Sequence, residues 1–400
     1  MCKPLFVAAA LCLVSAQVLA QGAFPLKYQD LDPQAVPTLR MAGKYAGGTG
    51  EKPSAVVAGP AGAAQAVTYF GPSVGDKPRW FAIVAANPPK LYADTNGNND
   101  LSDEKAVDGA GPDQNGMVSF GPVTLAVGEN ASVRVRAMMP RAPPGARVPF
   151  LLVLPAGGVV GDVTLGGQTH RAMLVDGNLN GRYDDTFSGS GDLQAADFLA
   201  IDLNQNGCFD LPDLGNTDAI ETFPRSNGIK VSEAYYRIRA PADGSQIQAE
   251  KIEPTFGTLE VDIPGLTLLT LSDDFGFQRI GPVDGKVSVV AGKYTVLQMT
   301  LAQRDEAGVE WTLTGRGGKW KNFQILPDQT LQLQLGPPLK ASIEVDQNNG
   351  TASMTFLLVG RGEEVYAGGA SKDGKMQPAP KFEILDETGK VLATGKFEYG

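Results

Sequence analysis

Histidine and cysteine are almost missing from this chain of 400 residues, which has one histidine and three cysteines. A single histidine cannot build a zinc site that needs several imidazoles, and no H-E-x-x-H sequence occurs. G-x-S-x-G occurs once, as GPSVG at residues 71–75, but a strand-like run follows it, whereas a nucleophile elbow leads into a helix. Cys2 and Cys12 lie in the first 20 residues, so Cys208 has no partner for an internal disulfide in the rest of the chain. The commonest zinc-protease and serine-hydrolase sites are therefore excluded, as is a disulfide framework.

Long apolar runs are also scarce. Residues 1–20 carry one positive charge, Lys3, then an apolar run from Leu5 to Val14 and small residues before Gln21. This pattern predicts a secretory signal peptide that is removed after Ala20. The run is shorter than the roughly 20 apolar residues that cross a bilayer. We therefore expect a secreted or periplasmic protein without a membrane span.

Positive charge is in deficit, and the deficit is concentrated in one segment. The formal net charge of the chain is -10. Between Asp162 and Glu221 there are eleven acidic residues and two basic ones, which gives -9 for that segment. Nucleic-acid binding needs a basic surface, so the composition excludes it. Crowded carboxylates repel one another, and bound cations would supply the missing charge.

Helical periodicity is scarce, whereas short alternating runs such as "RWFAIVAAN" and "GDVTLGGQTHRAMLVD" are frequent. With 49 glycines and 28 prolines between them, these runs predict antiparallel strands and tight turns. The expected fold is all-β, with tandem β-sandwich-like domains, inserted calcium-binding loops and little helix. The expected domains are 1–20 (signal peptide), 21–225 (three loop motifs), 226–335 and 336–400.

The segment "DLNQNGCFDLPD", residues 202–213, has the residue types of a calcium-binding loop. Calcium takes six to eight oxygen ligands, and such a loop offers them at positions 1, 3 and 5, at the backbone carbonyl of position 7, and at positions 9 and 12. A glycine at position 6 permits the bend, and an apolar residue at position 8 anchors the loop. The candidate ligands are Asp202, Asn204, Asn206, Cys208 through its carbonyl, Asp210 and Asp213.

Here the sequence resembles the calcium loops of dockerin and EF-hand-like repeats found in secreted bacterial proteins. Two further segments share the resemblance in part, residues 176–187 and residues 94–105. The candidate ligands of residues 176–187 are Asp176, Asn178, Asn180, Arg182 through its carbonyl, and Asp184. Those of residues 94–105 are Asp94, Asn96, Asn98 and Asp100. Both loops lack an acid at position 12, where Phe187 and Lys105 stand.

The acid that closes these two incomplete loops must therefore come from elsewhere. For residues 94–105 the candidates are Asp103 and Glu104. For residues 176–187 they are Asp185, Asp192 and Asp197, of which Asp197 is favoured because "ADFLAID" would return past the loop as a strand. Asp197 also lies five residues before Asp202, so we expect the two acidic loops to share it as a ligand or to be coupled through their charges. A polar hairpin turn rich in Asn and Gly is the alternative reading of each segment.

Dockerin and EF-hand loops lead into helices, but strand-like segments enter these loops and poor helix formers follow them. We therefore expect calcium loops joined to β-structure, without a cohesin partner. A short phrase, "VVAGKYTVLQ" near residues 287–299, is similar to transthyretin-like and carboxypeptidase-regulatory modules, which implies a sandwich there.

Catalytic residues are harder to find than metal ligands. His170 has two readings, a general base or a packing residue, and packing is favoured. The acid doublets Asp273–Asp274 and Glu363–Glu364 do not form dyads if they lie on strands, because adjacent strand residues point to opposite faces. A calcium-binding structural or binding protein, with a protein or carbohydrate partner, is therefore favoured over catalysis. The alternatives are a secreted hydrolase with structural calcium, which needs only two carboxylates, and an adhesion or scaffold module.

Overall fold

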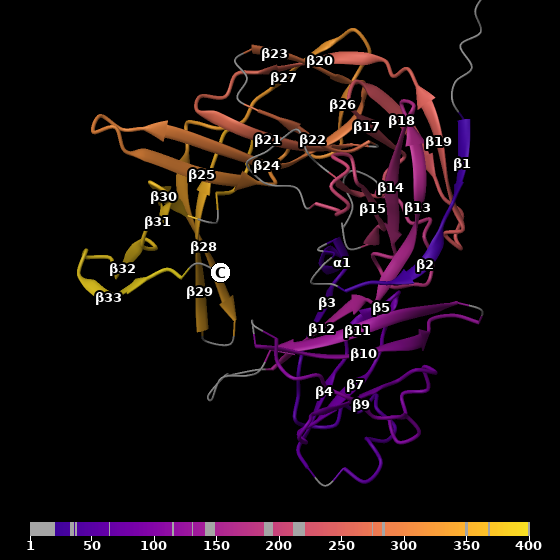
Figure 1. Ribbon diagram of the computed structural model, residues 1–400. Coiled ribbons are helices and arrows are strands. Elements are labelled where there is room, and N and C mark those ends of the chain that lie inside the picture. Colours follow the sequence, from indigo (N-terminus) through magenta and orange to yellow (C-terminus); the bar gives the residue numbers. More distant parts are fainter. Residues whose placement is uncertain are drawn as a thin grey trace, which may run out of the picture.

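The computed structural model is built almost entirely from antiparallel strands, which confirms the all-β expectation (Figure 1). It describes residues 21–32, 36, 38–63, 65–113, 116–129, 131–140, 149–187, 195–210, 221–273, 275–281, 285–348, 351–366 and 369–398. The expected signal peptide lies outside these ranges. The helix α1 (Thr38–Met41) is one short turn. Within the described ranges, no helix is long and apolar enough to cross a membrane.

The first unit packs two sheets around a core that includes Phe81, Leu91, Val135 and Leu151. One sheet has the order β4 (Val67–Phe70), β7 (Phe81–Val84), β8 (Lys90–Ala93) and β9 (Val107–Asp108). The other has the order β10 (Met117–Ala126), β11 (Ser132–Pro140), β12 (Phe150–Pro155) and β3 (Lys44–Gly47). A small hairpin of β5 (Ser73–Val74) and β6 (Lys77–Pro78) lies beside them.

The second unit also packs two sheets face to face, around Leu174, Leu199, Ile229 and Ile238. One sheet has the order β16 (Thr222–Pro224), β15 (Phe198–Ile201), β14 (Gln168–Val175), β13 (Gly157–Leu165) and β2 (Lys27–Asp30). The other has the order β1 (Gln21–Pro25), β19 (Gln246–Ile252), β18 (Ala234–Arg239) and β17 (Gly228–Val231). This core joins residues on both sides of position 225, where the sequence placed a domain boundary.

The third unit has a core that includes Leu259, Leu269, Val289 and Val296. One sheet has the order β23 (Gly285–Val290), β20 (Phe256–Val261) and β27 (Thr330–Leu333). The other has the order β22 (Gly276–Ile280), β21 (Leu266–Asp273), β24 (Gly292–Arg304), β25 (Glu310–Arg316), β30 (Ala370–Lys372) and β31 (Lys375–Met376), and β26 (Phe323–Ile325) pairs with β24.

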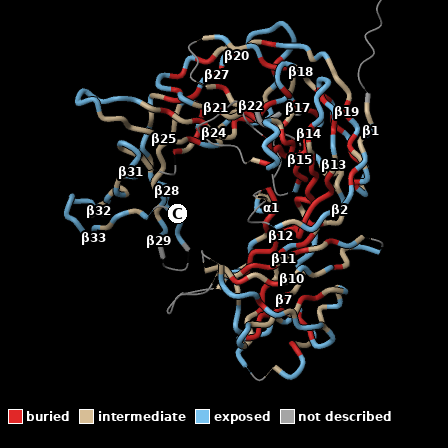
Figure 2. The backbone as a smooth tube through the Cα atoms, in the orientation of Figure 1, coloured by how far each residue is buried: buried red, intermediate tan, exposed pale blue. Residues whose placement is uncertain are grey.

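Two hairpins near the C-terminus contribute little to these cores. They consist of β28 (Lys340–Asn348) with β29 (Thr351–Val359), and β32 (Lys381–Leu385) with β33 (Val391–Lys396). After Tyr366, no described residue is buried. Figure 2 shows both hairpins in the colours of exposed and half-buried residues.

The three loop motifs follow strands, as expected, and no described helix follows them. Residues 94–105, 176–187 and 202–213, called loops 1, 2 and 3 below, begin where β8, β14 and β15 end. β14 and β15 are antiparallel neighbours, with Val175 opposite Phe198 and Ala172 opposite Ile201. Loops 2 and 3 therefore begin at opposite ends of this strand pair.

Candidate metal sites

Loop 2 folds around the carboxylate of Asp176, which follows β14 and is buried. Its oxygens accept the backbone N–H groups of Asn180 at 3.1 Å and Gly181 at 2.7 Å. Gly181 has a φ of +79°, the left-handed conformation that glycine adopts at little cost. The first carboxylate thus holds the turn that brings positions 3 and 5 back toward it.

The amides of Asn178 and Asn180 meet at one carboxylate of the same loop. Their Nδ2 atoms donate to Oδ2 of Asp185, at 3.2 and 2.7 Å. Their Oδ1 atoms accept the N–H groups two residues further on, those of Asn180 and Arg182. An amide oxygen has two lone pairs, so each retains one acceptor site after this bond.

Loop 3 repeats this arrangement after β15. Asp202 accepts the N–H groups of Asn206 and Gly207 at 3.0 and 2.9 Å. The amides of Asn204 and Asn206 donate to Oδ2 of Asp210 at 3.0 and 2.9 Å. Phe209, at position 8, is buried against the sheet that contains β13, β14 and β15, as the anchoring role requires.

Loop 1 has the same plan with different residues. Asp94 accepts the N–H groups of Gly97 and Asn99, and Asn99, which replaces the glycine of position 6, has a φ of +60°. The amides of Asn96 and Asn98 donate to Asp103 Oδ2 at 3.2 and 2.9 Å. Of the two acids that the sequence proposed for this loop, Asp103 is therefore the one beside both amides.

Loop 1 also has a cation of its own. Arg79 Nη1 lies 3.9 Å from Asp94 Oδ2, and Nη2 donates to the carbonyl of Ala126. A Cβ at Gly97 would overlap this guanidinium, so glycine leaves room for it there. The Arg79 side chain is 13% exposed and that of Asp94 is 0% exposed, which makes this the most buried ion pair in the described part of the chain.

A second acid holds each loop through backbone N–H groups. Asp197 accepts those of Gly177 and Asp185, at 3.1 and 2.9 Å. Glu221 accepts those of Leu203, Asn204 and Asp210, each at 2.9 Å.

The counterpart in loop 1 is Glu104, which accepts the N–H of Thr95 at 2.6 Å. Asp197 directly precedes β15, which pairs with β14, the strand that leads into loop 2. Glu221 directly precedes β16, which pairs with β15, the strand that leads into loop 3. Because the pairs are antiparallel, the start of one strand lies beside the end of its neighbour. Sequence reasoning found Asp197 but missed Glu221. The available signal was an acid directly before the strand that follows the loop.

The suggestion that loops 2 and 3 share Asp197 does not match this geometry. The Asp197 carboxylate accepts hydrogen bonds from loop 2, and Glu221 takes the same role in loop 3. Asp197 and Asp202 stand at the two ends of β15, about 17 Å apart at the ordinary rise of a strand. Each loop therefore has its own second acid.

Burial and mutual repulsion perturb the carboxylates of loop 2. Burial, with a contribution from the charge of Asp185, raises the pKa of Asp176 to about 6. Burial, followed by the charge of Asp176, raises the pKa of Asp197 to about 8. Arg225 is buried nearby, and its Nη1 donates to the carbonyl of Asp184 at 2.9 Å. One arginine beside several carboxylates leaves the cluster short of positive charge.

Asp100, Asp184 and the thiol of Cys208 take no part in these carboxylate–amide clusters. Asp100 accepts the N–H and hydroxyl of Ser102. Asp184 pairs through both oxygens with Arg182 on the surface. Cys208 is exposed and donates its N–H to Asn206. Asp192 and Asp213 lie outside the described residues.

The donors present in loops 2 and 3 suit a hard cation. Each brings together two carboxylates and two amide oxygens, and the loop motif assigns a fifth oxygen to the backbone carbonyl of position 7. Asp197 or Glu221, or a water molecule, would bring the number of oxygen ligands to six. These are oxygen ligands, which calcium prefers and softer transition metals do not. Over the described ranges, no group of three or more His, Cys, Asp or Glu side chains forms a metal cluster. Half of the side chains that could bind an ion in each of these loops are asparagines, which such a group does not count.

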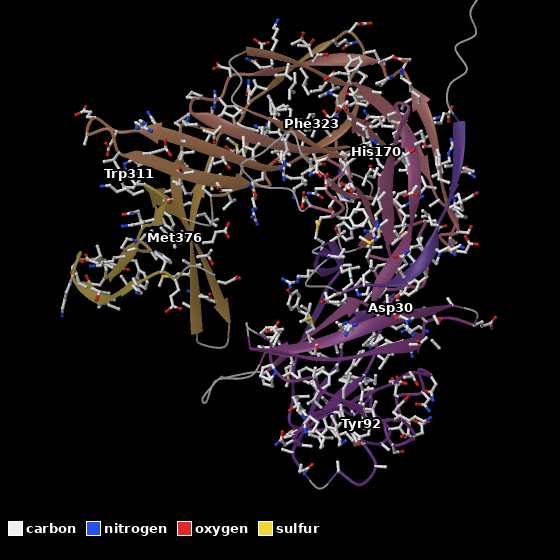
Figure 3. The ribbon with its side chains drawn as sticks, viewed as in Figure 1. Asp30, Tyr92, His170, Trp311, Phe323 and Met376 are labelled. Atoms are coloured by element: carbon white, nitrogen blue, oxygen red, sulfur yellow. The ribbon has the colours of Figure 1, made fainter. Side chains whose placement is uncertain are left out.

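A cavity of about 610 Å³ lies beside loop 3. Asn204 and Glu221 line it, together with His170 and Lys251 from the neighbouring strands (Figure 3, where His170 is labelled). His170 is 4% exposed, and its Nδ1 lies 3.0 Å from the carbonyl of Asp202. Because a carbonyl only accepts, Nδ1 carries the proton and Nε2 is an acceptor. Nε2 has no hydrogen-bond partner among the described residues.

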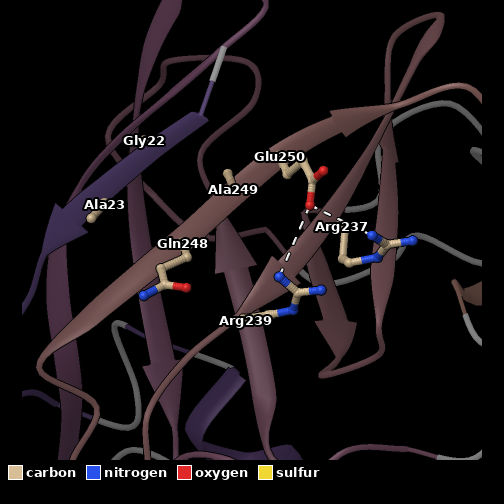
Figure 4. Close-up of a pocket in the computed structure, with 7 residues that line it drawn as sticks. All are labelled: Gly22, Ala23, Arg237, Arg239, Gln248, Ala249 and Glu250. Carbon is tan, nitrogen blue, oxygen red and sulfur yellow. Dashed lines mark hydrogen bonds and ion pairs between the residues drawn. The ribbon is translucent and has the colours of Figure 1, made fainter. Parts of the chain in front are cut away.

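The remaining charged features are explained by the fold. In a shallow depression on the face of β1, β19 and β18, Arg237 and Arg239 lie 3.5 and 4.0 Å from Glu250 (Figure 4). This is an exposed ion pair, which contributes little to stability. Glu364 is buried and accepts the N–H groups of Gly336 and Gly362 and the hydroxyl of Tyr366. Its bonds are structural, so the doublet Glu363–Glu364 is not an acid pair for catalysis.

Comparison of the chain with models of known families, with curated proteins and with solved structures found no match.

Proposed function

We propose that this protein is an exported calcium-binding protein in which loops 2 and 3 each bind one ion and thereby tie together the ends of neighbouring strands. One observation carries the proposal. In both loops, two asparagine amides and two aspartates converge with the same hydrogen bonds, although β14 and β15 place the loops at opposite ends of the sheet. A polar turn needs only a few of these hydrogen bonds, and it does not need the aspartate that accepts from both amides, Asp185 in loop 2 and Asp210 in loop 3.

The shortage of positive charge supports the same proposal. Burial raises the pKa values of Asp176 and Asp197 and so disfavours their charged forms; the charge of Asp185 adds to this at both groups, and that of Asp176 adds to it at Asp197. A divalent cation would be attracted by this field and would restore the charged form. Because two of the four side-chain donors are neutral amides, we expect the weak affinity of extracellular sites, with Kd of about 10⁻⁴–10⁻³ M.

The test is calorimetric titration of calcium into the chain from Gln21 onward. We expect two sites, and Asp202→Asn should remove one of them. The matched control is Asp162→Asn, an exposed aspartate on β13 outside the loops, which should retain both. At a tenfold excess of calcium over Kd, each site should add about 1.4 kcal/mol to the free energy of unfolding. An unchanged thermal melt and no heat of binding at millimolar calcium would rule the proposal out.

The cavity beside loop 3 favours a second candidate function, the binding of a small hydroxylated ligand. Its volume of about 610 Å³ is that of an ordinary ligand site. His170 Nε2 offers an acceptor for a hydroxyl group, and Asn204 joins the cavity wall to the calcium loop. Neutral mono- and disaccharides, titrated in the presence of calcium, test this candidate. Binding should be lost in His170→Ala, and absence of binding by the unmodified chain would refute it.

A further inference from the structure

The hairpin of β28 and β29 has one apolar face. Residues that lie opposite each other in an antiparallel pair point to the same side of the sheet. The register puts Ile343 opposite Phe356 and Val345 opposite Met354, with Ala341 opposite Leu358 at the base. The other face carries Lys340, Ser342, Glu344 and Asp346 of β28, opposite Val359, Leu357, Thr355 and Ser353 of β29. The strand β28 is therefore amphipathic, and the tip half of the hairpin has one polar face.

No core lies against most of this apolar face. Ile343 is 51% exposed and Val345 is 54% exposed. Phe397 packs on Phe356 with their ring centroids 5.7 Å apart, which covers one part of the face only. Figures 1 and 2 show the hairpin extending away from the third unit. Of the thirteen large apolar side chains exposed in the described chain, seven follow residue 340; two of these, Ile343 and Val345, lie on this face, and the other five lie on β31, β32 and β33. Clustered exposure of this kind marks an interaction surface.

The outer edge of β28 is also unpaired. Among the described strands, β28 pairs with β29 alone. A nine-residue edge presents a row of N–H and C=O groups that another strand can bond. It carries no proline and, at its centre, no lysine or bulge that would block pairing. A two-stranded hairpin is marginally stable by itself, whereas a sheet of three or more strands with an apolar face is stable.

The sequence of β28 is complementary to itself. In an antiparallel pairing of two copies about Ile343, Lys340 of each copy lies opposite Asp346 of the other. The same register places Ala341 opposite Val345. The numbers of facing residues differ by an even number, so the apolar faces of the two hairpins lie on the same side of the combined sheet. Attraction therefore occurs twice, once at each end of the interface. A register centred on Glu344 would place two glutamates together, which is unfavourable.

We infer that two copies of this chain associate through their β28 strands, forming a four-stranded antiparallel sheet with a continuous apolar face. The pairing is isologous, so it closes as a dimer and does not extend into a fibre. This inference is independent of the proposed calcium sites.

Sedimentation velocity over a series of micromolar concentrations of the chain from Gln21 onward tests the association. We expect a reversible dimer. Lys340→Asp and Asp346→Lys should each weaken it about tenfold or more, because both symmetry-related pairs become repulsive. The double variant should restore dimerisation toward that of the unmodified chain. A monomer at every concentration, or a dimer that neither single variant weakens, would overturn the inference and leave this face to a different partner.

Cross-linking tests the register directly. In a Cys208→Ser background, Ile343→Cys places two thiols opposite each other at the symmetry axis, where a disulfide can form. Gln347→Cys is the matched control, because it lies on the same face but about 27 Å from its copy in this register. Oxidation should cross-link the first variant and not the second. Equal cross-linking of both would contradict the register, and unchanged circular dichroism would show that both variants fold.

Discussion

Loops 1 and 2 share a plan but balance their charges differently. Asp94 of loop 1 lies 3.9 Å from the largely buried guanidinium of Arg79. Asp176 of loop 2 is under the influence of the charge of Asp185, and Arg225 contacts this loop through the carbonyl of Asp184. An arginine is thus the counter-charge of loop 1, whereas under the proposed function a calcium ion would be the counter-charge of loop 2. Sequence similarity between the loops does not by itself say which one is used.

The largest expected effect is that of Asp197→Ala. The change leaves the N–H groups of Gly177 and Asp185 without their acceptor, and each such loss in a buried site costs about 1–3 kcal/mol. We expect a total loss of about 3 kcal/mol in urea unfolding. Glu104→Ala is the matched change in loop 1 and should cost less, since Glu104 is only half-buried. Equal losses of unfolding free energy in Asp197→Ala and Glu104→Ala would show that the two loops do not differ in how strongly these acids stabilise them.

The pH dependence of stability should differ with and without calcium. The folded-state pKa values of Asp197, about 8, and of Asp176, about 6, lie above those of an unfolded aspartate. The folded state therefore binds protons more tightly, and stability is lost as pH rises from about 4 to about 8. We expect stability in chelator to fall over this pH range, measured by urea unfolding. Bound calcium should lower both pKa values and flatten the curve, and a flat curve in chelator would contradict the account.

Arg79→Gln should make loop 1 resemble loop 2. Removing the guanidinium leaves Asp94 buried without its cation, so we expect a loss of about 1–2 kcal/mol in the absence of calcium. Added calcium should recover part of this loss, and titration should find one more site than in the unmodified chain. The same number of sites, with stability not recovered, would show that loop 1 cannot bind the ion at all.

Cys208→Ser should have the smallest effect. The side chain is exposed, and position 7 contributes its backbone N–H and carbonyl to the loop. We expect a change in stability within about 0.5 kcal/mol, as for other surface substitutions, and a calcium affinity within a few-fold. A larger change in either quantity would give the thiol a role that loop 3 does not predict.

The sequence by itself determined the class of fold and the existence of the loops. Alternation of apolar residues and the frequent turn residues encode strands locally, and the segment that joins β18 to β19 turns at Asp243–Gly244, a residue pair typical of hairpin turns. The motif positions likewise fix Asp176, Asn178 and Asn180 within one turn, because they are separated by a few bonds of backbone. Such contacts depend on neighbours in the chain and can be read from it.

The tertiary structure alone decided which distant groups complete each loop. Glu221 reaches loop 3 because β16 pairs with β15, and Arg79 reaches loop 1 although it precedes the motif by fifteen residues. The core that crosses position 225 was also invisible in the sequence, because β17 to β19 find their apolar partners in an earlier sheet. Strand pairing and burial join residues without regard to their spacing, so neither the counter-charge of a loop nor the limits of a core can be read from a local pattern.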